Sequence, residues 1–139
     1  MTSVLFDSCL EKHFAGDISF PSDKFRVILV NAQYAPKPDH SSRSDVIGEV
    51  SAEGYTKGGA AVAVSITRNK TERSFDINLG GAAWSSSTIV ARGAVYFKDN
   101  GHTDLDDLVA YIDFNGVVVS TNGLFSLSPS ILKFQTERA

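Results

Sequence analysis

The residue types in this chain that could do chemistry are histidine, cysteine and the acidic residues, and their spacing decides what they predict. His13, His40 and His102 are far apart in the chain, and without paired ligand spacing they do not indicate a zinc site. Cys9 falls within an apolar helical stripe, where a buried thiol is inert. As the single cysteine it forms no intramolecular disulfide. These residues predict neither a metal centre nor a nucleophile.

An acidic cluster follows Asn100-Gly101 and consists of Asp104, Asp106 and Asp107. Its alternating carboxylates are similar to part of a calcium loop, but the terminal bidentate Glu and the central Gly are missing. The cluster is therefore better interpreted as a solvated loop at a sheet end. The chain also lacks a Gly-x-Ser-x-Gly nucleophile elbow and a glycine-rich phosphate loop. We expect no catalytic residue, no metal and no cofactor, and hence no enzyme.

Length and charge narrow the class of protein further. A chain of 139 residues predicts one domain, residues 1–139. Thirteen basic and sixteen acidic residues give a net charge of −3, which disfavours nucleic acid and anionic membranes as main partners. No apolar run approaches the roughly 18 residues of a membrane span. Because Met1 to Leu5 has no positive charge, it does not resemble a signal peptide, and we expect synthesis in a cytoplasm.

The elements that would position these residues begin with a helix. Phe6, Leu10 and Phe14 recur at i, i+4 and i+8, which predicts a helix over about residues 3–15 that packs on a sheet. Gly16 is placed to end it.

After the helix the apolar period changes to two. Phe25 to Val30 is apolar on both faces, as in a strand covered on both sides. Asn115-Gly116 lies between two alternating runs and predicts a tight hairpin. Seven or eight short strands predict a mainly β protein, an antiparallel, jelly-roll-like β-sandwich with one N-terminal helix packed on it. The expected strands are 25–30, 60–67, 75–79, 89–97, 108–114, 117–120, 124–127 and 131–134.

Two stretches are candidates for partner binding. The irregular segment 31–47 is long enough to predict a functional or mobile loop. The glycine-rich segment Gly48 to Gly59 predicts a sheet edge that a neighbour could extend. Candidate interface anchors are Trp84 and, on the outward faces of their strands, Tyr96 and Tyr111, while filling of the core is at least an equal interpretation of Trp84. The predicted partner-binding residues are Tyr34, Pro36, Pro38, Val50, Tyr55, Tyr96 and Tyr111.

The order of segments resembles a family of small tailed-phage virion proteins that decorate, or cement, the capsid. The similarity spans nearly the whole chain and departs from the family after Leu127, where this chain has Lys133 and a polar tail. The matching pieces are 14–18 (FAGDI), 25–30 (FRVILV) with 34–36 (YAP), 48–59 (GEVSAEGYTKGG), 83–88 (AWSSST) with 91–99 (ARGAVYFKD), and 108–114 (LVAYIDF).

This resemblance implies a virion structural protein that binds the major capsid protein and reinforces the head shell. It implies a homo-oligomer, with a trimer as one option, located in the virion after production in the host cytoplasm. A tail, neck or fibre-associated virion protein is one alternative. A carbohydrate-binding β-sandwich, with Trp84, Tyr96 and Tyr111 stacking on sugars, is another.

Overall fold

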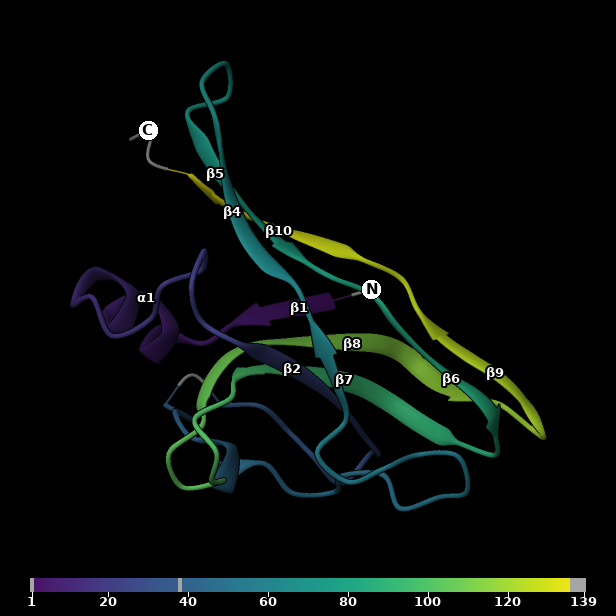
Figure 1. Cartoon of the computed structure of the whole chain (residues 1–139). Coiled ribbons are helices and arrows are strands. Elements are labelled where there is room, and N and C mark those ends of the chain that lie inside the picture. The colour runs from purple at the N-terminus through teal and green to yellow at the C-terminus, as the bar shows by residue number, and fades with distance from the viewer. Residues whose placement is uncertain (1, 38, 136–139) are drawn as a thin grey trace.

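A computed structural model describes residues 2–37 and 39–135 of the protein. The protein is mainly β, with antiparallel sheets and one helix near the N-terminus (Figure 1). The predicted class is confirmed. The elements are β1 Thr2–Leu5, α1 Asp7–Phe14, β2 Phe25–Val30, the short 3-10 helix η1 Arg43–Asp45, β3 Ala60–Val62, β4 Val64–Asn69, β5 Ser74–Leu79, β6 Ala82–Ser87, β7 Val90–Lys98, β8 Asp107–Val119, β9 Gly123–Leu127 and β10 Ser130–Gln135.

Three sheets surround the main core in a sandwich-like arrangement. A five-stranded sheet has the order β1-β8-β7-β2-β3, a three-stranded sheet the order β10-β5-β4, and β6 pairs with β9. Side chains from all three sheets, such as Leu29, Ile77 and Phe125, belong to one buried cluster. The sheets therefore bury their apolar faces against a common core.

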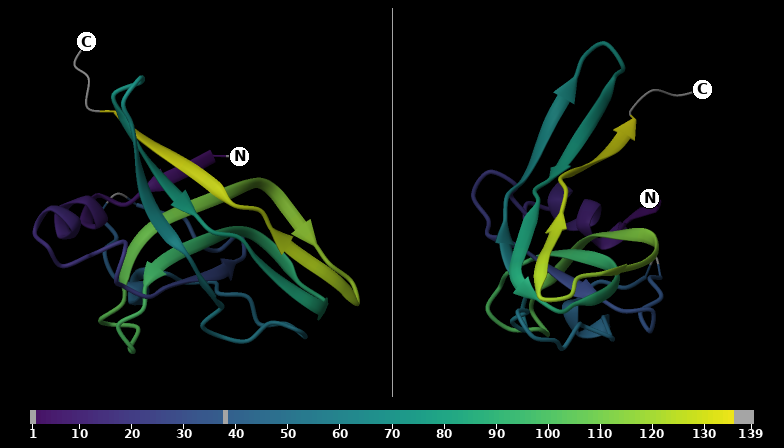
Figure 2. Two further views of the ribbon diagram at one scale, coloured as in Figure 1. Left: turned by 45° about the horizontal axis from the view of Figure 1, so that its top comes forward. Right: turned by 90° about the vertical axis from the view of Figure 1, so that its right-hand side faces the viewer.

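Most of the sheet structure is one long antiparallel ribbon. The segment holding β5, β6 and β7 pairs in reverse order with the segment holding β8, β9 and β10. The ribbon bends sharply between its β7–β8 and β6–β9 sections and folds back over the body (Figure 2). At this bend Ile89 and Ser120 exchange backbone hydrogen bonds of 3.1 and 2.8 Å, and the buried Ser87 and Ser120 hydroxyls lie 2.9 Å apart. Continuous pairing through the bend holds the two halves of the ribbon together.

Both faces of β2 are covered, as its sequence predicts. Val27 and Leu29 point into the main core, whereas Ile28 and Val30 join a second buried cluster on the other face. Tyr34, from the segment after β2, belongs to that second cluster. The irregular segment 31–47 thus serves as a cover for one face of the five-stranded sheet.

The N-terminal helix is shorter than predicted. Thr2–Leu5 forms β1, which pairs with β8, and the helix begins only at Asp7. Phe14 is 74% exposed and does not pack in the core, although Gly16 follows the end of the helix with a φ of +87°, as expected. The predicted start is wrong because the free edge of β8 offers these residues backbone partners that a local helical period does not reveal.

The predicted hairpin at Asn115-Gly116 is also wrong, because β8 continues through both residues. The register between β7 and β8 shifts there, with Gly93 opposite Asp113 and Ala91 opposite Val118. Asn115 and Gly116 have φ values of 60° and 153°, so the positive-φ pair makes a bulge instead of a turn. Because β8 pairs with β7 both before and after the bulge, the chain continues as one strand and does not reverse direction.

The predicted strand 60–67 divides between two sheets. β3 pairs with β2, whereas β4 pairs with β5 in the three-stranded sheet. β4, β5, β10 and the turn 70–73 extend away from the body (Figures 1 and 2), and we call them the arm.

Candidate functional site

The predicted partner-binding residues lie mostly inside the molecule. Tyr34, Val50, Tyr55, Tyr96 and Tyr111 are buried. Pro36 is partly exposed, and Pro38 lies outside the described residues. The expected outward orientation of Tyr96 and Tyr111 is wrong, since their exposed fractions are 0% and 3%. The reason is that both faces of the five-stranded sheet are covered where these residues lie, so that Tyr96 packs in the main core and Tyr111 in the second buried cluster.

The aromatic platform expected for sugar stacking is absent from the described surface. Trp84 is buried, with its ring centroid 5.9 Å from that of Tyr55 and 6.1 Å from that of Phe125. The Tyr96 hydroxyl donates a hydrogen bond of 2.9 Å to the Gly80 carbonyl, and burial raises the pKa of Tyr96 to about 12. These rings fill the core, so the carbohydrate-binding interpretation loses the feature that suggested it.

Tyr34 attaches the segment 31–47 to the sheet. Its ring meets Tyr111 edge to face at 5.5 Å, and its hydroxyl lies 3.0 Å from Nδ1 of His40. Burial raises the pKa of Tyr34, and the negative charge of Asp45 adds to the shift. Tyr34 is an anchor of the loop and does not present its ring to a partner.

Glu49 holds the glycine-rich segment 48–59 against β2. Its carboxylate accepts hydrogen bonds from Arg43 at 2.5 Å, from the Tyr55 hydroxyl at 2.6 Å and from the Gly58 N–H at 2.8 Å. The Tyr55 hydroxyl in turn accepts the Leu29 N–H at 3.2 Å. Burial, followed by the hydrogen bond to Glu49, raises the pKa of Tyr55. The Glu49 carboxylate therefore holds Arg43, Tyr55 and Gly58 together. The spacing of these residues in the sequence does not reveal that they share one hydrogen-bond network.

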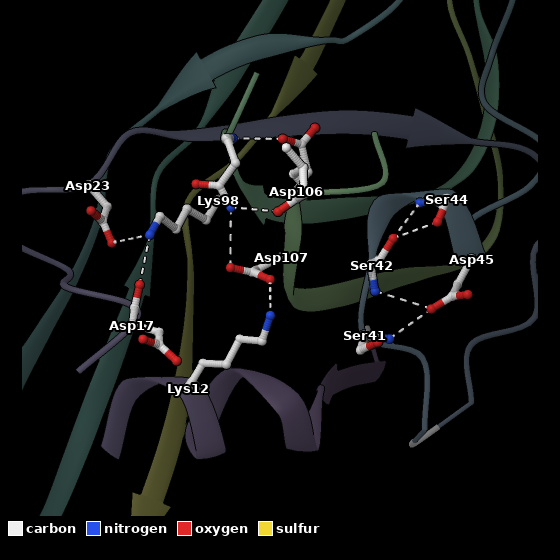
Figure 3. A network of polar contacts seen from close by, with 12 residues as sticks. Lys12, Asp17, Asp23, Ser41, Ser42, Ser44, Asp45, Lys98, Asp106 and Asp107 are labelled. Atoms are coloured by element: carbon white, nitrogen blue, oxygen red, sulfur yellow. Dashed lines mark hydrogen bonds and ion pairs between the residues drawn. The ribbon is translucent and has the colours of Figure 1, made fainter. Parts of the chain in front are cut away.

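The acidic cluster after Asn100 is largely structural. Asp106 and Asp107 are buried, so the predicted solvated loop is correct only for Asp104. Asp106 accepts the Asn100 N–H at 2.7 Å, and Asp107 pairs with Lys12 of α1 (Figure 3). These contacts fix the loop 99–106 to the helix.

Lys98 continues the same network at the end of β7. Its ammonium group donates a 2.7 Å hydrogen bond to the Asp17 carbonyl and lies 3.2 Å from a carboxylate oxygen of Asp23 (Figure 3). The connection between α1 and β2 is thereby tied to the strand, so this end of the sheet is rigid.

The loop around η1 is ordered by Asp45. Its carboxylate accepts the N–H groups of Ser41 and Ser42 at 2.9 and 3.1 Å (Figure 3). These hydrogen bonds lower the pKa of Asp45. The Ser44 N–H donates to the Thr103 carbonyl at 3.2 Å, which joins this loop to the loop 99–106. The two loops form one preorganised surface at the end of the sheet.

The chain has no match among protein-family models, curated proteins or solved structures. Within residues 2–37 and 39–135, no three His, Cys, Asp or Glu side chains are grouped so that they could hold a metal ion. Nor does that part of the chain contain a helix with the length and apolar character needed to cross a membrane.

The features that remain for a partner are exposed apolar side chains and open sheet edges. β4 and β10 are the edges of the three-stranded sheet, and among the described strands each of them pairs on one side only. Unpaired strand edges bind other chains readily. Large apolar side chains with high exposure occur on the helix, on loops and on strands, at Phe14, Ile47, Val90, Leu105, Val117, Val118, Val119, Leu124 and Ile131. This arrangement is suited to protein contacts over several small patches.

Proposed function

We propose that this chain is a structural protein of a tailed-phage virion, which binds the major capsid protein and reinforces the head shell. The observation that carries the proposal is the ordered resemblance to capsid-decoration proteins over segments from Phe14 to Phe114. The partners are the shell lattice and other copies of the chain, and the site of action is the virion.

The rigidity of the loops supports this role. A protein that reinforces a lattice binds best when its contact surfaces are ordered before binding, because ordering a loop costs affinity. The Glu49 contacts and the Lys12–Asp107 pair order the segments 43–58 and 99–106 in the free chain. Many weak contacts made by many copies then add up to strong reinforcement.

The proposal is tested with purified shells that lack this protein. The full chain should co-sediment with them, reach hundreds of copies per particle, and raise the temperature at which shells release their DNA. Six or twelve copies would point to the tail or neck alternative, in which the arm reaches a neighbour in a ring. Absence of binding to heads, tails and whole particles would overturn the proposal.

A surface variant tests which loop meets the shell. Lys37 is exposed in the segment 31–47, and Lys24 is exposed outside it. Lys37→Glu should weaken shell binding, whereas the matched control Lys24→Glu should not. Equal binding by both variants would exclude this loop from the contact.

A further inference from the structure

An apolar groove lies between α1 and the arm. It has a volume of about 180 Å³ and is open to solvent, and Phe14 at its rim is 74% exposed. A single copy of the chain leaves Phe14 exposed and Leu10, Ile66 and Phe75 partly exposed, over the buried Phe20 and Ile77. The lining residues are Leu10, His13, Phe14, Phe20, Ile66, Phe75 and Ile77.

The same face of the arm becomes basic toward its tip. Ile66 and Arg68 alternate along β4 and therefore share one face, and Phe75 lies opposite Arg68 in the register. A second hollow begins at Phe75 and is lined by Arg68, Lys70 and Arg73. An occupant of the groove should therefore combine an apolar side chain with an adjacent negative charge.

The loop 99–106 presents that combination. Leu105 is 62% exposed, and the exposed Asp104 precedes it. The Asn100 side-chain amide donates a 2.6 Å hydrogen bond to the Leu105 carbonyl, and the Leu105 N–H donates a 2.9 Å hydrogen bond to the His102 carbonyl. The pair is thus held in place before any partner arrives. We call Asp104 and Leu105 the knob.

The knob is remote from the groove of its own chain. Figures 1 and 2 show the loop between β7 and β8 on one side of the body and the arm projecting from the other, with α1 between them. Complementary surfaces that cannot meet within one chain can meet between chains.

We propose that the knob of one copy docks in the groove of a second copy, with Leu105 against the apolar lining and Asp104 beside Arg68. This deepens the proposed function, on which its biological meaning rests, by naming the contact between copies. The contact joins different surfaces of the two copies. Reciprocal docking of both knobs gives a two-fold dimer, and one-way docking repeats into a ring or a row.

Sedimentation of the full chain without shells, at rising concentration, tests the apolar half of the contact. Wild type should associate reversibly. Leu105→Ser should weaken association about tenfold or more, because the variant lacks the apolar side chain whose burial favours docking. Leu124→Ser is the matched control, since Leu124 is 65% exposed but lies on β9, and it should leave association unchanged.

Charge exchange tests the polar half. Asp104→Lys and Arg68→Glu should each weaken association, and the double variant should recover most of the loss, because the pair is restored with its signs reversed. Circular dichroism confirms that each variant is folded. Wild type that stays monomeric up to about 1 mM, equal loss in the two leucine variants, or absence of recovery in the double variant would overturn the inference. Because no shell is present, these outcomes are independent of the shell-binding test.

Discussion

Replacing Glu49 by alanine should remove the main polar attachment of the loop 31–59. The change deletes the acceptor of three hydrogen bonds and leaves the Arg43 guanidinium, with a side chain only 12% exposed, without its carboxylate partner. Removing one member of a buried ion pair costs about 3–5 kcal/mol. Because both side chains keep some contact with water, we expect the lower end, a loss of about 3 kcal/mol of unfolding free energy.

Denaturant unfolding monitored by fluorescence and circular dichroism measures this loss as a shift of the midpoint. Glu49→Gln keeps an acceptor for Tyr55 and Gly58 but not the charge, so it should lose only about 1–2 kcal/mol. Glu53→Ala is the matched control. Glu53 is an exposed glutamate in the same loop, where surface changes usually stay within about 0.5 kcal/mol.

Amide exchange gives a second, local measurement of the same contact. The Gly58 N–H, which donates to Glu49, should exchange much faster in Glu49→Ala, while amides in β7 should change only with global stability. A loss below about 1 kcal/mol, or a protected Gly58 amide in the variant, would refute the assignment of Glu49 as the residue that holds the loop.

Three further predictions concern backbone and titration. Gly59→Ala should lower the free energy of unfolding by more than about 4 kcal/mol, because an added Cβ would lie 1.8 Å from the Val27 carbonyl oxygen. Gly58→Ala has open space around the added Cβ and should cost only about 1–2 kcal/mol, from the strain of its positive φ. Urea unfolding midpoints of the two variants compare these losses. Burial, and to a lesser extent the negative charge of Asp107, raises the pKa of Cys9 to about 12. A thiol reagent at pH 8 should therefore label Cys9 only when the chain unfolds. The free energy of unfolding should fall above pH 9.0, because the thiol of the unfolded chain ionises there while the folded one stays protonated. The stabilisation from Asp45 should be complete above its ordinary pKa of 3.8 and disappear as pH falls through its lowered folded value, seen as shifts of the Ser41 and Ser42 amide resonances that Asp45→Asn abolishes.

The strands that follow a regular period are the part of the fold that sequence predicts well. Phe75 to Leu79 alternates and forms β5, and the apolar run Phe25 to Val30 forms β2 with both faces covered. In both cases local sequence carries the information, because burial of each side chain follows from its position along the strand.

Elements that depend on a distant partner are the part that sequence does not predict. Thr2–Leu5 joins β8 as β1, and Asn115-Gly116 bulges within β8 because β7 pairs on either side of it. Neither result follows from residues nearby in sequence. Likewise Arg43, Glu49 and Tyr55 have no spacing that indicates a shared hydrogen-bond network, which exists only once the loop folds onto β2.

The aromatic site residues show the same limit and change where a partner should be sought. Alternation places Tyr96 and Tyr111 on particular strand faces, but it does not say that a loop held by Tyr34 covers one of those faces. Once covered, these rings stabilise the fold and are inaccessible to any partner protein. A partner is then to be sought at side chains that the fold leaves exposed, and Leu105, which has the charged neighbour Asp104, is the one for which we propose a groove on a second copy. In the proposed assembly, the buried rings would contribute only through the rigidity that they give to the surfaces around them.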